Sequence, residues 1–195
     1  HPVAAKAKAF GVPIIGDIDI FAKNFKNTRI IGVTGTNGKS TTTALIGHVL
    51  SHSNISNEVA GNIGRPVLEM SSDTRPDFIV LELSSYQLEL SPSLACSIAV
   101  LLNITPDHLD RHGGMEGYVR AKRRIFDNLS YDPKIIIGTD DEITRSICHQ
   151  FKHQSDLSVI PISGYQIPEN GVGVESGNLR SNLPGIPKCE INLNE

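Results

Sequence analysis

The chain has 195 residues, of which 39% are hydrophobic and 20% are charged, a composition typical of a globular domain. Its formal net charge of -3 lacks the basic excess of a nucleic-acid-binding protein, and no apolar run approaches the ~20 residues that cross a membrane. We therefore expect neither nucleic acid nor a membrane as a partner. The three scattered cysteines, Cys96, Cys148 and Cys189, predict free thiols in a reducing cytoplasm.

The first segment, 1–27, contains a short helix-like stretch and then the apolar run Val12–Gly16. We interpret it as the end of a preceding domain with a linker. The remainder, 28–195, alternates apolar runs with amphipathic stretches, which is typical of an α/β domain with a mostly parallel sheet flanked by helices. After Ser163 the chain becomes rich in Gly, Pro and Asn, which predicts short strands and turns. The expected strands are 29–34, 77–83, 96–104, 134–138 and 157–162, and the expected helices are 39–52, 115–129 and 141–151.

A glycine-rich loop joins the first expected strand to the first expected helix. In such a setting, backbone N–H groups and the positive end of the helix bind phosphate, a lysine reaches the outer phosphates and a serine hydroxyl ligates Mg²⁺. The usual pattern has a glycine where Val33 stands, so this loop is tighter than the common form. The alternative is a glycine-rich turn with an incidental lysine. The candidate nucleotide-binding residues are Gly35, Thr36, Asn37, Gly38, Lys39, Ser40 and Thr41.

A carboxylate lies near the end of the second expected strand. Glu82 follows the apolar run Phe78–Leu81, and a buried carboxylate needs a hydrogen-bond or cation partner. A Mg²⁺ ion held by the phosphate loop is the candidate partner, because phosphate-loop enzymes place an acidic group on a neighbouring strand. The alternative is a structural ion pair with a lysine or arginine.

A histidine and a lysine complete the candidate site. His108 follows the third expected strand, so we expect it at the sheet edge that also carries the phosphate loop and Glu82. Lys122 falls near the middle of the apolar face of the next helix, where burial would lower the pKa of its amine. A neutral amine can react with CO₂ to give an anionic carbamate that ligates metal. The alternative is a lysine whose stem reaches out to solvent.

These motifs, in this order, resemble those of the Mur ligases, the ADP-forming amide synthetases of peptidoglycan assembly. The phosphate loop resembles theirs, including the missing first glycine. The runs at 61–64, 83–89 and 107–111 resemble those of the members that add D-glutamate. The run at 118–125 resembles the family helix that bears a carbamylated lysine.

The resemblance implies ATP-dependent addition of D-glutamate to UDP-N-acetylmuramoyl-L-alanine through an acyl phosphate. It implies that Lys39, Glu82, His108 and Lys122 are catalytic. Ser40 and Glu82 would hold one Mg²⁺ ion, and His108 with carbamylated Lys122 would hold a second. It further implies that Asn62, Ser84 and Gln87 contact the muramoyl substrate.

The family has three domains, and we expect this chain to carry the central one, without most of the N-terminal domain or the C-terminal ligase domain. Its own central domain is expected to be incomplete, because the late His-Asn motif of the family is missing. We therefore expect a monomeric chain with little or no ligase activity alone. The alternatives are a folylpolyglutamate-type ligase, a phosphate-loop kinase or GTPase, which would need a different first glycine, and a nucleotide-binding fragment without catalysis.

Overall fold

The computed structural model describes residues 2–26, 28–71, 75–154, 157–187 and 189–193. Its centre is one sheet with the strand order β2-β3-β1-β4-β5-β6-β7-β8-β9. Neighbouring strands pair in parallel from β2 to β7, and the last two pairings are antiparallel. The strands are β1 (Arg29–Thr34), β2 (Asn57–Gly61), β3 (Phe78–Glu82), β4 (Cys96–Leu101), β5 (Leu129–Gly138), β6 (Ser158–Ser163), β7 (Val172–Glu175), β8 (Asn178–Ser181) and β9 (Glu190–Asn192).

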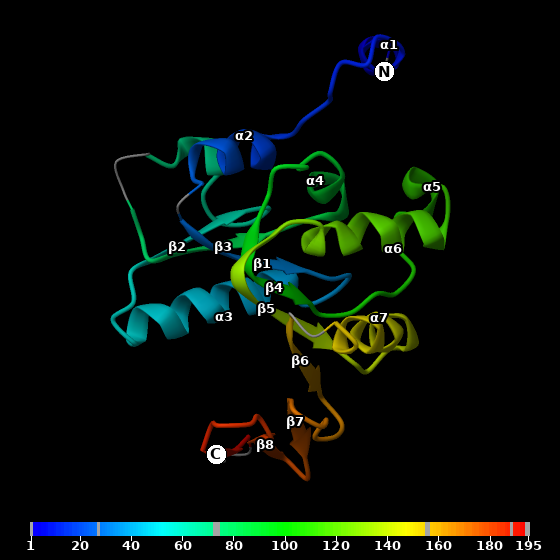
Figure 1. Cartoon of the computed structure of the whole chain (residues 1–195). Coiled ribbons are helices and arrows are strands. Elements are labelled where there is room, and N and C mark those ends of the chain that lie inside the picture. Colours follow the sequence, from blue (N-terminus) through cyan, green and yellow to red (C-terminus); the bar gives the residue numbers. More distant parts are fainter. Residues whose placement is uncertain (1, 27, 72–74, 155–156, 188, 194–195) are drawn as a thin grey trace.

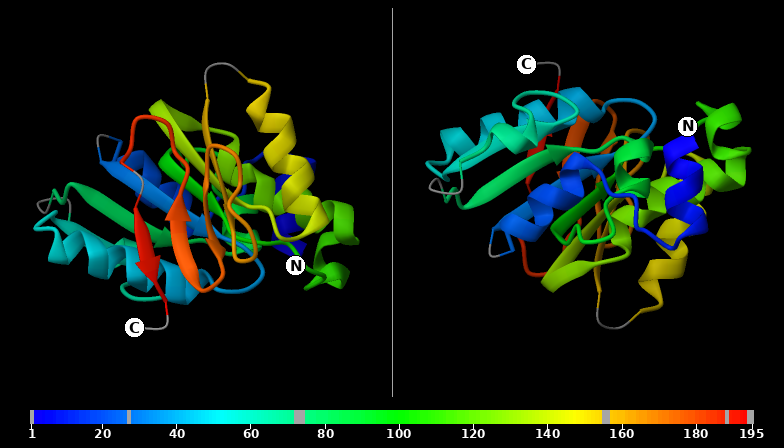
Figure 2. Two further views of the ribbon diagram at one scale, coloured as in Figure 1. Left: turned by 90° about the horizontal axis from the view of Figure 1, so that it is seen from below. Right: turned by 90° about the horizontal axis from the view of Figure 1, so that it is seen from above.

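Helices cover both faces of the sheet, as the sequence predicts. On one face α3 packs through Ile46 and Leu50, and on the other α7 packs through Ile147, so the two helices lie on opposite sides in both views of Figure 2. Strands covered in this way are continuously apolar, and all five residues of β3 are buried. The α-helices are α1 (Pro2–Ala9), α2 (Asp17–Asn24), α3 (Lys39–His52), α4 (Ser85–Glu89), α5 (Leu109–His112), α6 (Met115–Arg123) and α7 (Glu142–Lys152), and the 3-10 helices are η1 (Val67–Glu69) and η2 (Arg124–Phe126).

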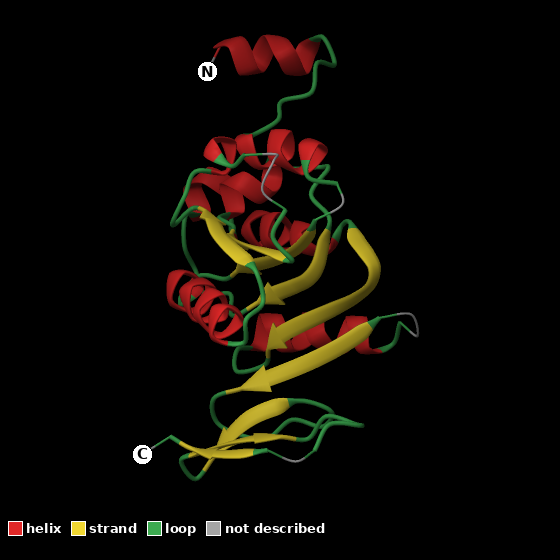
Figure 3. Cartoon of the chain, turned by 90° about the vertical axis from the view of Figure 1, so that its left-hand side faces the viewer, coloured by secondary structure: helices red, strands yellow, loops and turns green. Residues whose placement is uncertain are grey.

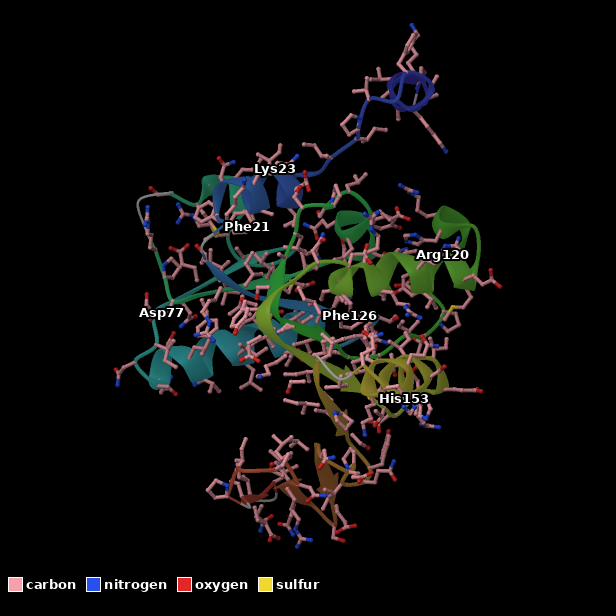
Figure 4. All side chains as sticks on the ribbon, in the orientation of Figure 1. Phe21, Lys23, Asp77, Arg120, Phe126 and His153 are labelled. Carbon is pink, nitrogen blue, oxygen red and sulfur yellow. The ribbon has the colours of Figure 1, made fainter. Side chains whose placement is uncertain are left out.

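The larger part of the core lies beneath α2, α4 and α6. Phe21 of α2 and Phe126 of η2 both pack into it, and both are labelled in Figure 4. The helix α1 has no buried residue and projects from the body at the end of an extended segment (Figure 1). At the opposite end of the molecule, strands β7 to β9 form the predicted region of short strands and turns (Figure 3). Within the described ranges, no helix is long and apolar enough to cross a membrane.

One predicted helix was too long. The expected helix 115–129 ends at Arg123, and after the turn of η2 the chain enters β5 at Leu129. The reason is strand pairing: Leu129 is the register partner of Cys96, and the carbonyl of Asn128 accepts a hydrogen bond from the Cys96 N–H at 3.2 Å. The helical periodicity of the sequence continues to Leu129, but in the structure Leu129 pairs with β4 as the first residue of β5. The structure also adds β2, α2, α4 and α5, which the sequence analysis does not predict.

Candidate active site

The phosphate loop lies between β1 and α3 at the carboxyl edge of the sheet. Gly38 has a φ of 82°, a left-handed conformation that side chains other than glycine rarely adopt, and it caps the N-terminus of α3. The first N–H groups of a helix have no intrahelical acceptor, so those of Lys39, Ser40 and Thr41 are available to a bound anion. The local geometry is therefore that of an anion-binding loop.

Asn103 braces this loop from the end of β4. Its Oδ1 accepts hydrogen bonds from the backbone N–H groups of Thr36, at 3.1 Å, and Asn37, at 2.8 Å. Its Nδ2 donates to the Asn37 carbonyl at 3.0 Å. The Thr36 hydroxyl lies 3.0 Å from the hydroxyl of Tyr118 on α6. The loop is thus fixed by two residues that the sequence analysis did not select.

Glu82 is buried at the end of β3, as predicted. One of its oxygens, Oε1, accepts a hydrogen bond from Asn62 Nδ2 at 3.0 Å. Its other oxygen, Oε2, is buried and has no hydrogen-bond partner among the described residues. A buried carboxylate oxygen without a donor is costly. The pairing therefore leaves an oxygen ligand available, and this is the kind of ligand that Mg²⁺ prefers.

The backbone brings Asn62 to Glu82 through a close approach at the end of β2. Gly61 has a φ of 106°, and a Cβ atom placed on it would lie 2.4 Å from the Glu82 carbonyl oxygen. Only glycine fits there. The Asn62 N–H donates to that same carbonyl at 3.0 Å, so Gly61 allows Asn62 to hold both the backbone and the side chain of Glu82.

Lys122 is buried on α6, with 2% of its surface exposed, which excludes the alternative of a lysine that reaches solvent. Its ammonium Nζ donates to the Gly35 carbonyl at 2.7 Å and lies 4.7 Å from the centre of the Tyr118 ring. Burial, with a smaller contribution from the positive charge of Lys39, lowers the pKa of Lys122 to about 7, although Asp107 opposes the shift. A large fraction of this amine is therefore neutral near pH 7.

Five of the predicted site residues line one cavity of about 200 Å³. Lys39 enters it from the phosphate loop, where its Nζ donates to the Thr36 carbonyl at 2.8 Å. Glu82 lies behind Asn62 and does not line the cavity. The lining residues are Lys39, Asn62, Ser84, Ser85, Tyr86, Asp107, His108, Tyr118 and Lys122. Five of these nine were predicted from motifs that are far apart in the sequence, so the structure brings the motifs together.

Ser84 and Gln87 have a local structural role. The Ser84 hydroxyl accepts from the Gln87 N–H at 3.2 Å, and the Gln87 side-chain oxygen accepts from the Ser84 N–H at 3.0 Å. This reciprocal pair is a capping box at the start of α4. Ser84 still lines the cavity, whereas Gln87 does not, and contact of Gln87 with a substrate stays a prediction.

His108 lines the cavity, as expected of a residue at this sheet edge. Its φ is 50°, its side chain is half exposed, and its Nε2 lies 3.5 Å from Asp107 Oδ2. No group of three or more His, Cys, Asp or Glu side chains within the described residues is arranged to hold a metal ion. A second ion shared by His108 and Lys122 therefore stays a prediction.

A second histidine, His112, supports the wall of the cavity and was missed. Its side chain is fully buried, with Nε2 at 3.0 Å from the Ser85 hydroxyl and Nδ1 at 3.0 Å from a Glu89 oxygen. Its ring packs between Tyr86, at 5.3 Å, and Tyr118, at 5.4 Å. The spacing of four residues from His108 is the one sequence signal that points to it.

Residues 33–166 match the family model described as the Mur ligase middle domain. Among curated proteins, the chain is 46% identical over 193 residues to a UDP-N-acetylmuramoylalanine--D-glutamate ligase of Rhodospirillum rubrum, covering 99% of this chain and 40% of the relative. It is also 47% identical over 185 residues to the ligase of that name in Caulobacter sp., covering 92% of this chain and 39% of the relative. The chain thus spans about two fifths of the length of these relatives.

Solved structures share the fold at low sequence identity. A MurF ligase from Thermotoga maritima in complex with ADP superimposes with a TM-score of 0.61 and 19% identity, covering 84% of this chain and 41% of that one. A UDP-N-acetylmuramate:L-alanyl-gamma-D-glutamyl-meso-diaminopimelate ligase from Neisseria meningitides superimposes with a TM-score of 0.65 and 16% identity. The match covers 97% of this chain and 63% of that one. Together with the loop, the buried lysine and the family match over 134 residues, from 33 to 166, these likenesses show that the chain belongs to the Mur ligases and carries their middle domain.

Proposed function

We propose that this chain is the ATP-handling part of an ADP-forming ligase that joins D-glutamate to UDP-N-acetylmuramoyl-L-alanine. The observation that carries the proposal is the cavity in which Lys39 of the phosphate loop meets Lys122, His108 and Asn62. The choice of D-glutamate is supported by the names of relatives that are 46% and 47% identical. The site residues and their roles are part of this proposal.

The proposal includes a division of the chain. Residues 1–27 would end a preceding UDP-binding domain, and residues 28–195 would be the central domain, with the remaining ligase residues supplied from outside this chain. The projecting position of α1 supports a separate first part, but α2 packs through Ile18 and Phe21 into the core of the second part, which favours a boundary ahead of Asp17. The chain alone would be a monomer with little ligase activity, and it would act in the cytoplasm, where ATP is available.

The first step would be phosphorylation of the substrate carboxylate. Lys39 and the N-terminal N–H groups of α3 would hold the γ-phosphoryl group, so that charge developing on its oxygens meets fixed positive groups. The carboxylate oxygen attacks phosphorus, the bond to the β–γ bridging oxygen breaks, and ADP leaves. Asn62 and Ser84, which line the cavity, would orient the muramoyl-alanine end.

The second step would be attack by the amine of D-glutamate on the acyl carbon, with loss of phosphate and a proton. Mg²⁺, when bound, would supply charge neutralisation for the phosphates, and the Ser40 hydroxyl would hold one such ion together with the Glu82 oxygen that lacks a hydrogen-bond partner. His108 with carbamylated Lys122 would hold a second. Lys39, Lys122 and Asp107 all line the cavity. The net charge of the cavity would therefore change when Lys122 is carbamylated.

The phosphate role is tested by titrating a non-hydrolysable ATP analogue with Mg²⁺ into the chain by calorimetry. Lys39→Ala should weaken binding by about tenfold or more, because a charge-assisted hydrogen bond is worth ~2 kcal/mol. Lys8→Ala, an equal charge change on α1 far from the cavity, is the control and should bind as the unmodified chain does. Unchanged affinity in Lys39→Ala, or no binding by the folded chain, would contradict nucleotide binding by this chain.

The acceptor is tested with a chain completed by the domains of the full ligase. ADP release should require both UDP-N-acetylmuramoyl-L-alanine and D-glutamate, and it should not respond to a folate substrate. Release at full ligase rates by residues 1–195 alone would refute the division of the chain.

A further inference from the structure

The helix α7 carries two exposed histidines on one side, away from the cavity. His149 lies in its last turn and His153 is its C-terminal cap, so the two are four residues apart and lie on the same face. Their Nε2 atoms face each other at 3.4 Å, and the rings meet edge to face with centres 4.6 Å apart. Figure 4 labels His153 beside α7 at the outside of the molecule.

The distance between the two nitrogens matches a chelate. Zinc binds imidazole nitrogen at ~2.0–2.1 Å with tetrahedral angles, which places two such nitrogens about 3.3–3.4 Å apart. A direct N–H···N hydrogen bond would be ~0.3 Å shorter than the observed 3.4 Å. The pair is therefore spaced as two ligands of one ion are, and it is too far apart for a good hydrogen bond between the rings.

The C-terminal end of α7 also favours a cation, although Lys152 adds one positive charge in the same turn. The last carbonyl groups of a helix carry partial negative charge, so positive charge is stabilised at the end where His149 and His153 lie. Two histidines one helical turn apart are a known way to bind zinc from one face of a helix. Both rings are exposed, so an ion can reach them without any rearrangement of the core.

A second pair at the same spacing provides an internal comparison. His48 and His52 lie on α3, but their ring centres are only 4.0 Å apart and the rings are tilted over each other. The Nδ1 of His52 lies 3.0 Å from the His48 carbonyl oxygen, so that nitrogen is already engaged. Both pairs therefore have the same spacing in the sequence, but only on α7 do two ring nitrogens of the pair face each other.

We propose that His149 and His153 form a zinc site, with one Zn²⁺ ion held between their Nε2 atoms. Because no set of three or more His, Cys, Asp or Glu side chains is gathered for a metal in the described part of the chain, water completes the tetrahedron. Imidazole also suits Cu²⁺ and Ni²⁺, and the 3.4 Å spacing favours the tetrahedral ion. This inference does not depend on the proposed ligase function.

The test is calorimetric titration of ZnCl₂ into the whole chain at pH 7.5, in a buffer that does not bind metal. The starting protein carries Cys189→Ser, because the exposed thiol of Cys189 would itself bind zinc. His149→Ala and His153→Ala should each weaken binding by about tenfold or more, since each removes half of a chelate. The double variant His48→Ala/His52→Ala should leave the affinity unchanged, and circular dichroism checks that every variant is folded.

The expected result is one zinc ion per chain, lost from either α7 variant. Nitrogen chemical shifts give a second readout: Zn²⁺ should move the Nε2 signals of His149 and His153 and leave those of His48 and His52 in place. Equal binding in the α7 variants, or an equal loss in the α3 double variant, would overturn the proposal.

Discussion

The lowered pKa of Lys122 predicts a stability that depends on pH. The folded chain has a pKa of about 7 at this amine, below the ordinary lysine value of 10.5, so the unfolded chain binds more protons between these two pH values. Stability therefore rises with pH across that window. Since one pKa unit corresponds to 1.36 kcal/mol, burial of the amine costs about 4 kcal/mol at pH 7 and about 2 kcal/mol at pH 9.

The substitution Lys122→Met keeps the length of the side chain and removes the charge. The variant also loses the hydrogen bond to the Gly35 carbonyl. Where the amine is neutral, this loss changes the free energy of unfolding by the same amount at every pH. The free energy of unfolding of the unmodified chain should rise relative to the variant by about 2 kcal/mol from pH 7 to pH 9. Urea denaturation in CO₂-free buffers measures this difference, with the exposed Lys152→Met as a control that should show none. A difference that stays flat over this range would refute a lowered pKa at Lys122.

Three further predictions follow from the same site and core. Gly61→Ala should cost about 2 kcal/mol or more in urea denaturation, because its Cβ would clash with the Glu82 carbonyl, whereas Gly113→Ala, also at positive φ but with open space, should cost less. Asn103→Ala should cost about 1–2 kcal/mol by the same assay, through the two loop N–H groups that it leaves unpaired, and an unchanged midpoint would contradict its bracing role. Burial raises the pKa of the Cys96 thiol to about 12, so native protein at pH 8 should expose only the Cys189 thiol to a chromogenic disulfide reagent, and fast reaction of a second thiol would contradict this.

The strongest local signals predicted the fold best. The bounds of β1 and α3 agree residue for residue with the expectation, because an apolar run, a glycine-rich loop and a helix follow one another directly. The strand β2 was missed because only one of its five residues is fully buried, which leaves no clear alternation. The helix α4 has five residues, too few for a helical period, and only its capping box marks it.

In the candidate site, too, residues with a local sequence pattern could be predicted, and residues placed by distant contacts could not. The burial of Lys122 could be predicted, because helical periodicity alone placed it on the apolar face of α6. Asn103 has no local pattern that could predict it, and His112 has only its spacing of four residues from His108, which does not indicate burial. Their partners, Thr36 and Ser85, lie 67 and 27 residues away in the sequence. Such residues can be identified only from the structure, because the strand order of the sheet determines which loops come into contact.

The two lysines of the cavity suggest an order of events. Lys39 and Lys122 donate to the consecutive carbonyls of Thr36 and Gly35, and the positive charge of Lys39 helps to lower the pKa of Lys122. A triphosphate bound at Lys39 would add negative charge, which stabilises the ammonium form of Lys122. Because CO₂ reacts with the neutral amine, a carbamate should form more readily before the nucleotide binds.

Carbon-13 NMR with labelled bicarbonate at pH 8 measures this effect of the nucleotide on carbamate formation. A carbamate signal is expected in the unmodified chain, and it should be absent from Lys122→Met, which has no amine at this position. The signal should be weaker in the presence of a saturating ATP analogue than in its absence, since the analogue raises the pKa of Lys122. An equal yield with and without the analogue would show that the phosphates do not act on Lys122. A signal that persists in Lys122→Met would place the carbamate on another amine.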